Sequence, residues 1–492
     1  MATIPGSAFP APVAAPPFEP FRIKVVEPIR MSTRQERERI LEKAGFNLFG
    51  IDSENVLVDL LTDSGTAAMS AQQWGALMQA DESYAGGASF RRLESAVREI
   101  TGFDHVIPTH QGRAAERILF SVLSKPGHVI PGNSHFDTTR ANIEHTGAEA
   151  LDLLCGEARQ ISAALPFKGN IDVDALRATV ERLGAKRIPL AMMTVTNNSA
   201  GDQPVSMANL RAVKAVLAEH GIPLYLDACR FSQNAYFIQQ REAGYRDKTA
   251  KEIAREMFSL ADGCTMSAKK DGLANMGGFI ALRDEELARR LKDVLILTEG
   301  FPTYGGLSGR DLEAIAIGLE EALDDRYLHY HASVTRWFGE SLAAAGVPII
   351  EPPGGHAVYL DASRFMEHLP AAAHPGHALA AELYLEGGIR TATMRFPRLQ
   401  GMSANDPQTE LVRLALPSRV YTASHLQYAI DAVVRVYRNR AAVGGLEMTY
   451  TPPFLRNFTA RFARIGANPA SGAPLASGGP SETPYNGHGR LP

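Results

Sequence analysis

Short apolar runs alternate with longer amphipathic stretches over the first two thirds of the chain. Apolar runs bounded by turn residues predict strands, and apolar positions three or four apart predict helices. The predicted strands are residues 106–108, 129–130, 189–195, 223–226, 263–266 and 278–282. The predicted helices between them include residues 114–123, 207–219, 251–258 and 285–295. Strands this short and this apolar predict an α/β protein with a parallel or mixed sheet that helices cover on both faces.

The pattern changes after about residue 311. Helices are predicted at 330–345 and 377–386, and strands at 348–351, 357–360 and 412–416. This mixture predicts a smaller α+β domain over residues 326–465, which the segment 21–60 joins, beside a large domain over residues 61–325. The ends of the chain are rich in Pro, Ala, Gly and Ser. We therefore expect a flexible arm at residues 1–20 and a disordered tail at residues 466–492.

Length and composition narrow the class of protein. A chain of 492 residues is too long for one compact core, and its net charge of −4 gives no reason to expect a nucleic acid or an anionic membrane as partner. Three cysteines, far apart and without a C-x-x-C pair, argue against a disulfide framework or a zinc site. No run approaches the roughly 18 apolar residues of a membrane span, and the N-terminal stretch lacks a basic region, so we expect a cytoplasmic protein.

A lysine pair, Lys269 and Lys270, follows the predicted strand 263–266 in the stretch SAKKDG. Lysines in such positions are mostly solvated. The position also suits an amine at the lip of a pocket, where surroundings that disfavour its charge let it form a Schiff base with a carbonyl cofactor. If the pair has that role, other parts of the chain must complete a pyridoxal phosphate site.

Two strand ends carry polar groups that such a site needs. Gly112 and Arg113 stand where strand 106–108 gives way to a helix, and glycine, helix N–H groups and a guanidinium together suit a phosphate. A simple turn with a solvent-facing arginine would give the same pattern. Asp227 follows strand 223–226, where a buried carboxylate needs a cationic partner such as a pyridinium nitrogen, although it could equally cap the next helix. Arg230 can point toward the same crevice.

Two further residues could complete a site for an aromatic ring. Phe136 is a candidate to stack on the ring, although a single phenylalanine is more often part of a core. Asn198, after the strand 189–195, could hydrogen-bond a ring oxygen or be an ordinary turn residue.

The order of these parts along the chain matches the pyridoxal phosphate enzymes of the aspartate aminotransferase type. More narrowly, the chain resembles the β-eliminating lyases, tryptophanase and tyrosine phenol-lyase, from about residue 20 to residue 465. The resemblance implies a fold type I architecture and a pyridoxal-phosphate-dependent carbon–carbon lyase. The motifs that carry it are LLTDSGTAAMS, DESYAG, PTHQGR, GDQPVSMANLRAV, TMSAKKD, FPTYGGLSGRD, GGHAVYLDA, LVRLALPSRVYT and LRNFTARF.

The resemblance implies a role for each matching residue. Lys270 would be the Schiff-base lysine, with Lys269 as its neighbour. Tyr84 would be the general acid that protonates the leaving group, Tyr304 would reach in from a neighbouring subunit, and Arg413 would bind the substrate carboxylate. The cofactor would further be held by Gln111, Gly112, Arg113 and Ser267 at the phosphate, Phe136 on the ring face, Asp227 at the pyridine nitrogen, and Asn198 and Arg230 at the ring hydroxyl.

The resemblance also implies a potassium ion and a homotetramer. The ion would be bound by Gly65, Asn275 and Glu82, and oxygen ligands of this kind suit a hard cation. The tetramer would share its active sites between subunits across a dimer interface.

Positions around the leaving group depart from both named enzymes. Tyrosine phenol-lyases carry an arginine where this chain has Met394, although Arg395 is one residue away. Asp137 matches the acid that tryptophanases place after the stacking aromatic. Asn457 replaces a tryptophanase histidine, which keeps a hydrogen-bonding group and loses the titratable one. The pocket candidates are largely apolar: Phe49, Thr62, Phe301, Met394 and Phe458.

An apolar pocket suits an indole better than a phenol. We therefore expect cleavage of tryptophan, or of a substituted tryptophan, to an indole, pyruvate and ammonia. The alternatives are a tyrosine phenol-lyase in which Arg395 substitutes for the missing arginine, and a β-lyase for S-substituted cysteines. A non-catalytic pyridoxal-binding regulator would need a nucleic-acid-binding module, for which the N-terminal arm is too short.

Overall fold

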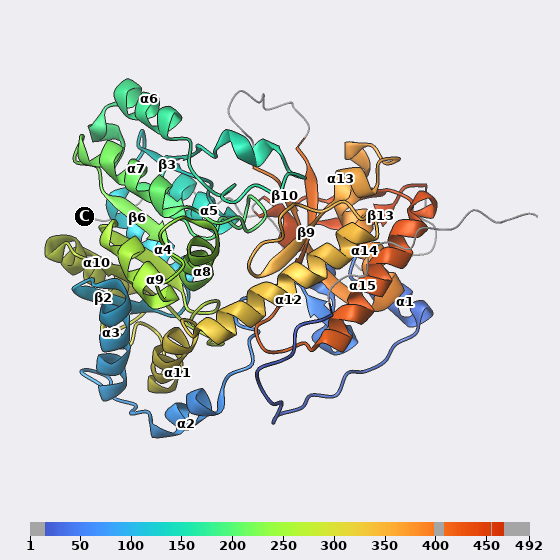
Figure 1. The fold of residues 1–492 in the computed structure, drawn as a ribbon, viewed down its shortest axis with the longest axis horizontal. Coiled ribbons are helices and arrows are strands. Elements are labelled where there is room, and N and C mark those ends of the chain that lie inside the picture. The colour runs from blue at the N-terminus through green and yellow to red at the C-terminus, as the bar shows by residue number, and fades with distance from the viewer. Residues whose placement is uncertain (1–14, 398–407, 454, 467–492) are drawn as a thin grey trace, which may run out of the picture.

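The computed structural model describes residues 15–397, 408–453 and 455–466. Most of the predicted arm and all but the first residue of the predicted tail lie outside the described residues. Two sheets dominate the molecule, and Figure 1 shows them side by side, the larger among green and blue elements and the smaller among orange and red ones. Within the described residues, no helix is both long and apolar enough to cross a membrane.

The larger sheet has seven strands in the order β2-β8-β7-β6-β5-β3-β4. Neighbouring strands from β7 to β4 run parallel, while β8 runs antiparallel to both β7 and β2. The strands are β2 (His105–Thr109), β3 (Val129–Gly132), β4 (Glu149–Asp152), β5 (Ala191–Thr194), β6 (Leu224–Asp227), β7 (Gly263–Ser267) and β8 (Gly278–Leu282).

Helices cover both faces of this sheet, as the apolar strands predicted. Successive side chains of a strand point to opposite faces, so Leu224 and Leu226 join one core cluster and Tyr225 joins the other. The face of Tyr225 is covered by α4 (Gly112–Leu123), α5 (Asp137–His145) and α10 (Glu285–Thr298). The opposite face is covered by α3 (Ala88–Thr101), α6 (Val173–Leu183), α7 (Met207–Ala218), α8 (Phe231–Arg241), α9 (Ala250–Ser259) and α11 (Gly309–Glu321), and α2 (Ala71–Gln79) packs on α11.

The smaller sheet combines one strand from the N-terminal segment with three from the last third of the chain. Its order is β1-β10-β11-β9, with β1 parallel to β10 and the other pairs antiparallel. The strands are β1 (Val58–Leu60), β9 (Ala357–Asp361), β10 (Ile389–Arg395) and β11 (Glu410–Ala415). Around it lie α1 (Arg34–Lys43), α12 (Asp325–Ala344), α13 (Ala362–Phe365), α14 (Pro375–Gly387), α15 (Ala423–Arg438), α16 (Arg456–Thr459) and the hairpin β12 (Leu446–Tyr450) and β13 (Arg461–Arg464).

The long helix α12 joins the two halves of the molecule. It packs on α8 beside the larger sheet and on α15 and β9 beside the smaller one (Figure 1). The segment before β1 and the residues after 325 share one apolar core. The domain boundaries at residues 60 and 325 stay a prediction.

Strand 278–282 has the predicted bounds, and the predicted helices agree to within a few residues. The strand predicted at 348–351 is wrong, because this segment makes only one isolated bridge, between Ile349 and Leu360. The backbone of Glu351 is engaged elsewhere: its N–H donates to Ile161 and its carbonyl accepts from Lys168. Strands β1, β4, β10, β12 and β13 were not predicted.

Candidate active site

The residues predicted for the cofactor gather at one edge of the larger sheet. Each follows the carboxyl end of a strand, and the carboxyl ends of neighbouring parallel strands lie along the same edge, where open α/β sheets bind ligands. The parallel register of β5, β6 and β7 aligns Thr194, Asp227 and Thr265. The structure thus brings together the ends of β2, β3, β5, β6 and β7.

The start of helix α4 lies directly against the end of β7. Gln111 is its N-cap residue in extended conformation, and Gly112 is its first residue. A Cβ atom on Gly112 would come within 2.6 Å of the Ser267 Cβ, so only glycine permits this approach. The N-terminus of α4, the Ser267 hydroxyl and the exposed Arg113 together offer the donors and positive charge that a phosphate needs.

Both lysines of the pair are half-buried beside this helix. The Lys270 ammonium lies 3.5 Å from the Ser64 hydroxyl, and the Lys269 carbonyl accepts from the Gly65 N–H at 2.7 Å. Burial lowers the pKa of Lys269, and the charges of Lys270 and Arg113 lower it further. A bound anion would reduce the repulsion between these neighbouring positive charges.

Asn198 has a donor that fits a cofactor oxygen. Its Oδ1 accepts hydrogen bonds from the Tyr359 hydroxyl at 2.8 Å and from Arg413 Nη1 at 3.2 Å. Its Nδ2 is buried and has no hydrogen-bond partner in the described part of the chain. A buried donor without an acceptor is costly, so this atom suits the ring oxygen that the resemblance assigns to it.

Asp227 is the last residue of β6 and is buried. One carboxylate oxygen accepts from the Cys229 N–H at 3.3 Å. No ion pair of Asp227 is seen in the described part of the chain, and a buried carboxylate of this kind matches the need of a protonated pyridine nitrogen. Phe136 is half-buried and is the N-cap residue of α5, so it belongs to the turn after β3 at the same edge of the sheet.

Arg230 forms a bidentate ion pair with Asp63, which sequence reasoning missed. Its Nε and Nη2 donate to the two carboxylate oxygens at 3.0 and 2.9 Å, and both side chains are buried. Burial alone would raise the pKa of Asp63, but the Arg230 guanidinium holds it well below its usual range. Asp63 stands in the motif LLTDSG, and its pairing over 167 residues left no local signal.

Arg413 lies on β11, opposite Tyr359 and Ala392. Besides Asn198, it donates from Nη2 to the Leu61 carbonyl at 3.0 Å, while its buried Nε has no partner among the described atoms. The free Nε suits a carboxylate ligand. Desolvation by the surrounding protein raises the pKa of Asp137, and the charge of Arg413 partly opposes this shift.

Two of the residues predicted for the leaving-group pocket, Phe49 and Phe458, are in contact. The rings of Phe49 and Phe458 lie 4.9 Å apart, and the Thr62 hydroxyl accepts from the Ser64 N–H at 3.0 Å. Asn457 belongs to α16, and its side chain lies outside the described residues.

Strand alternation separates Met394 from Arg395. Met394 packs against an apolar cluster that contains Phe396, on the same face of β10. Arg395 extends to the opposite face, where it pairs with Glu410 at 3.8 Å. A one-residue shift that would put Arg395 in the place of Met394 has no support in this register.

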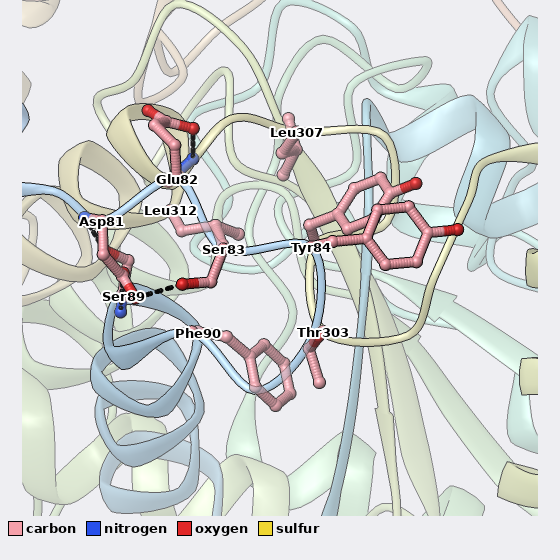
Figure 2. Close-up of a pocket in the computed structure, with 12 residues that line it drawn as sticks. Asp81, Glu82, Ser83, Tyr84, Ser89, Phe90, Thr303, Leu307 and Leu312 are labelled. Carbon is pink, nitrogen blue, oxygen red and sulfur yellow. Dashed lines mark hydrogen bonds between the residues drawn. The ribbon is translucent and has the colours of Figure 1, made fainter.

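Tyr84 and Tyr304 lie together in a cavity of about 270 Å³ that none of the predicted cofactor residues lines. Their ring centres are 5.4 Å apart, and the Tyr304 hydroxyl raises the pKa of Tyr84. Figure 2 shows the Tyr84 ring extending away from Asp81 and Glu82. Within one chain, the two tyrosines therefore form a group apart from the predicted cofactor residues.

Two of the three residues predicted for potassium are in contact. The Asn275 side chain donates to the Gly65 carbonyl at 3.0 Å. Glu82 instead binds the start of α11, accepting from the Gly309 N–H at 3.1 Å and pairing with Arg310 at 3.2 Å. A potassium site stays a prediction.

A family model described as beta-eliminating lyase matches residues 59–432. The chain belongs to the β-eliminating lyase family. It is 55% identical over 446 residues to a tryptophanase of Salinibacter ruber, covering 90% of this chain and 94% of that one. It is 49% identical over 450 residues to a tyrosine phenol-lyase of Pasteurella multocida, covering 91% and 98%.

Membership confirms the resemblance and makes the protein a pyridoxal-phosphate-dependent β-eliminating lyase. The fold prediction is also confirmed: a serine palmitoyltransferase of Sphingomonas wittichii superposes with a TM-score of 0.55 at 18% identity, over 83% of this chain and 97% of that one. Both lyases of the family are nearly equally similar, so overall identity does not choose the leaving group.

Proposed function

We propose that this lyase releases an indole from tryptophan or a substituted tryptophan, leaving pyruvate and ammonia. The observation that carries the proposal is the arrangement of β10. Met394 packs in an apolar cluster while Arg395 faces away toward Glu410, so neither position offers a cation to a phenol hydroxyl. Asp137 begins α5 near Arg413 and supplies an acceptor that an indole N–H could use.

The remaining residues divide the chemistry between binding and proton transfer. The start of α4 and Ser267 would hold the phosphate, and Asn198 Nδ2 would donate to the ring hydroxyl. Asp227 would keep a proton on the ring nitrogen, so that bound pyridoxal phosphate would supply an electron sink. Lys270 Nζ would take the proton from the substrate α-carbon.

Arg413 would bind the substrate carboxylate through its unpartnered Nε. Tyr84 would donate the proton that lets the aromatic carbon depart. Because Tyr84 and Tyr304 share one cavity apart from the cofactor residues, we propose that both tyrosines serve the site of a neighbouring subunit in a homotetramer.

The test is a substrate panel with the holoenzyme: tryptophan, tyrosine and S-alkylcysteine, with pyruvate and each released group measured separately. We expect indole and pyruvate in equal amounts from tryptophan. Pyruvate from S-alkylcysteine without indole from tryptophan would contradict the proposal.

Tyrosine phenol-lyase is the second candidate, because relatives with that name are 48–50% identical to this chain. The variant Met394→Arg separates the two. If the native enzyme is specific for indole, this variant gains activity toward tyrosine and loses activity toward tryptophan. Phenol release by the native enzyme that disappears in Arg395→Ala would favour the second candidate.

A further inference from the structure

Glu116 carries a buried carboxyl group on α4, the helix whose start would hold the phosphate. The mechanism above does not use this group. It lies one turn after Gly112 on α4, and its exposed fraction is 7%. A carboxylate in such a place is costly unless other groups satisfy it. Its surroundings therefore indicate what it does.

The donors to Glu116 all come from α5. The hydroxyl groups of Thr138 and Thr139 donate to its two oxygens at 3.0 and 2.6 Å, and Asn142 Nδ2 donates at 3.3 Å. Helix α5 begins immediately after Phe136. The carboxyl of Glu116 thus joins the helix that would hold the phosphate to the turn that would stack on the ring.

Two charged groups from other elements also act on Glu116. Burial raises its pKa to about 7, and the negative charge of Asp227 on β6 adds to this shift. The hydrogen bonds from Thr139 and Thr138 and the positive charge of Lys270 oppose it. Near neutral pH the carboxyl is therefore present both with and without its proton.

We propose that Glu116 is a positioning residue that couples α4, whose start would hold the phosphate, to the turn that carries Phe136. Its carboxyl oxygens accept hydrogen bonds from Thr138, Thr139 and Asn142, so it fixes the position of α5 relative to α4. The inference rests on the family cofactor and holds whichever group leaves the substrate.

Calorimetric titration of the cofactor-free protein with pyridoxal phosphate measures its affinity. Glu116→Gln keeps one acceptor oxygen for the threonine hydroxyl groups, so we expect it to restore part of the affinity that Glu116→Ala loses. Equal affinities of folded Glu116→Gln and Glu116→Ala, both below the native value, would overturn a role through these hydrogen bonds.

The coupling between helices is tested by cofactor affinity. Thr139→Val removes one donor and leaves the carboxyl in place, and Glu116→Ala removes the whole junction. We expect pyridoxal phosphate to bind about tenfold more weakly to Glu116→Ala, with Thr139→Val in between, as loss of hydrogen bonds to a charged group predicts.

Glu181→Gln on the exposed surface of α6 is the matched control and keeps native affinity. If Glu116→Ala does not fold, Thr139→Val decides the question alone. Native affinity in a folded Thr139→Val, or in a folded Glu116→Ala, would overturn the coupling.

Discussion

At the scale of single residues, the ion pair of Asp63 and Arg230 holds two segments of the proposed site together. Both side chains are buried, and their bidentate geometry fixes the guanidinium beside the end of β6. Lys270 lies close enough to Asp63 to lower its pKa further. The pair therefore connects the LLTDSG segment to the strand ends that would hold the cofactor.

Removing one partner of this pair leaves the other buried and uncompensated. We expect Asp63→Ala to lower the free energy of unfolding by about 3–5 kcal/mol, measured by urea denaturation. Asp52→Ala, at an exposed position, changes it by less than about 0.5 kcal/mol. A change at Asp63 as small as the control would contradict a stabilising role for the pair.

Some residues of the proposed site could be identified from the sequence and others could not. Lys270, Asp227 and Gly112 could be proposed because each stands at a strand end with a local chemical signature. Asp63 could not, because its partner Arg230 lies 167 residues away and nothing in the local pattern links them.

At the scale of elements, the contact between α4 and β7 sets the shape of the proposed phosphate site. The backbone of Gly112 approaches Ser267 so closely that a methyl group would overlap it. This contact requires the helix and strand to keep one relative position.

We expect Gly112→Ala to weaken pyridoxal phosphate binding about tenfold or more, because overpacking by one methyl group costs about 1–3 kcal/mol. Absorbance titration of the cofactor-free protein measures this. Gly127→Ala tests the specificity of the effect, because a Cβ there meets nothing within 4 Å, although its positive φ carries some strain. Equal affinity in Gly112→Ala and the native protein would contradict the contact.

A second element, the segment 156–168, ties the larger sheet to the smaller one. Lys168 is 1% exposed, and four backbone carbonyls surround its ammonium within hydrogen-bonding distance. The acceptors are Gln160 at 2.8 Å, Ile161 at 2.9 Å, Ala163 at 3.2 Å and Glu351 at 2.5 Å. Since Glu351 belongs to the part of the chain around the smaller sheet, Lys168 bridges both halves.

Burial lowers the pKa of Lys168 to about 8 from its usual value of 10.5. Between these two values the unfolded chain binds more protons than the folded protein, so the free energy of unfolding rises with pH. We expect this rise between about pH 8 and pH 10.5 to be smaller in Lys168→Met than in the native protein, measured by urea denaturation across that range. Lys186→Met, at an exposed position, keeps the native slope.

Strands that contain polar residues could not be recognised as apolar runs, and one apolar run does not form a strand. Strand β4 has an exposed Glu149 and lies at the edge of the sheet, and β10 mixes Arg390 and Thr391 with apolar residues. The run 348–351 is apolar enough for a strand, but the backbone of Glu351 bonds to Ile161 and Lys168 instead of to a neighbouring strand.

At the scale of the whole molecule, the proposed acid Tyr84 lies with Tyr304 in a cavity that none of the predicted cofactor residues of the same chain lines. The convergence of strand ends could be predicted from the sequence, because parallel strands share one carboxyl edge. The sequence pattern alone does not show which subunit each tyrosine serves, because that depends on how chains assemble. Only the family resemblance implied that Tyr304 reaches a neighbouring subunit.

If the proposed shared site is correct, two inactive variants complement each other. Lys270→Ala and Tyr84→Phe, mixed under conditions that let subunits exchange, should regain about a quarter of native activity, because half of the random dimers contain one intact site of two. No recovery after exchange, verified by mass, would indicate that each chain supplies both residues to its own site.

The proposed function requires that the enzyme accept an indole and reject a phenol. Incubating the holoenzyme with equal concentrations of tryptophan and tyrosine, and following indole and phenol together, measures the ratio of the two kcat/KM values directly. Met394 in its apolar cluster and Arg395 on the opposite face predict that indole is released faster than phenol. Faster release of phenol would contradict the account.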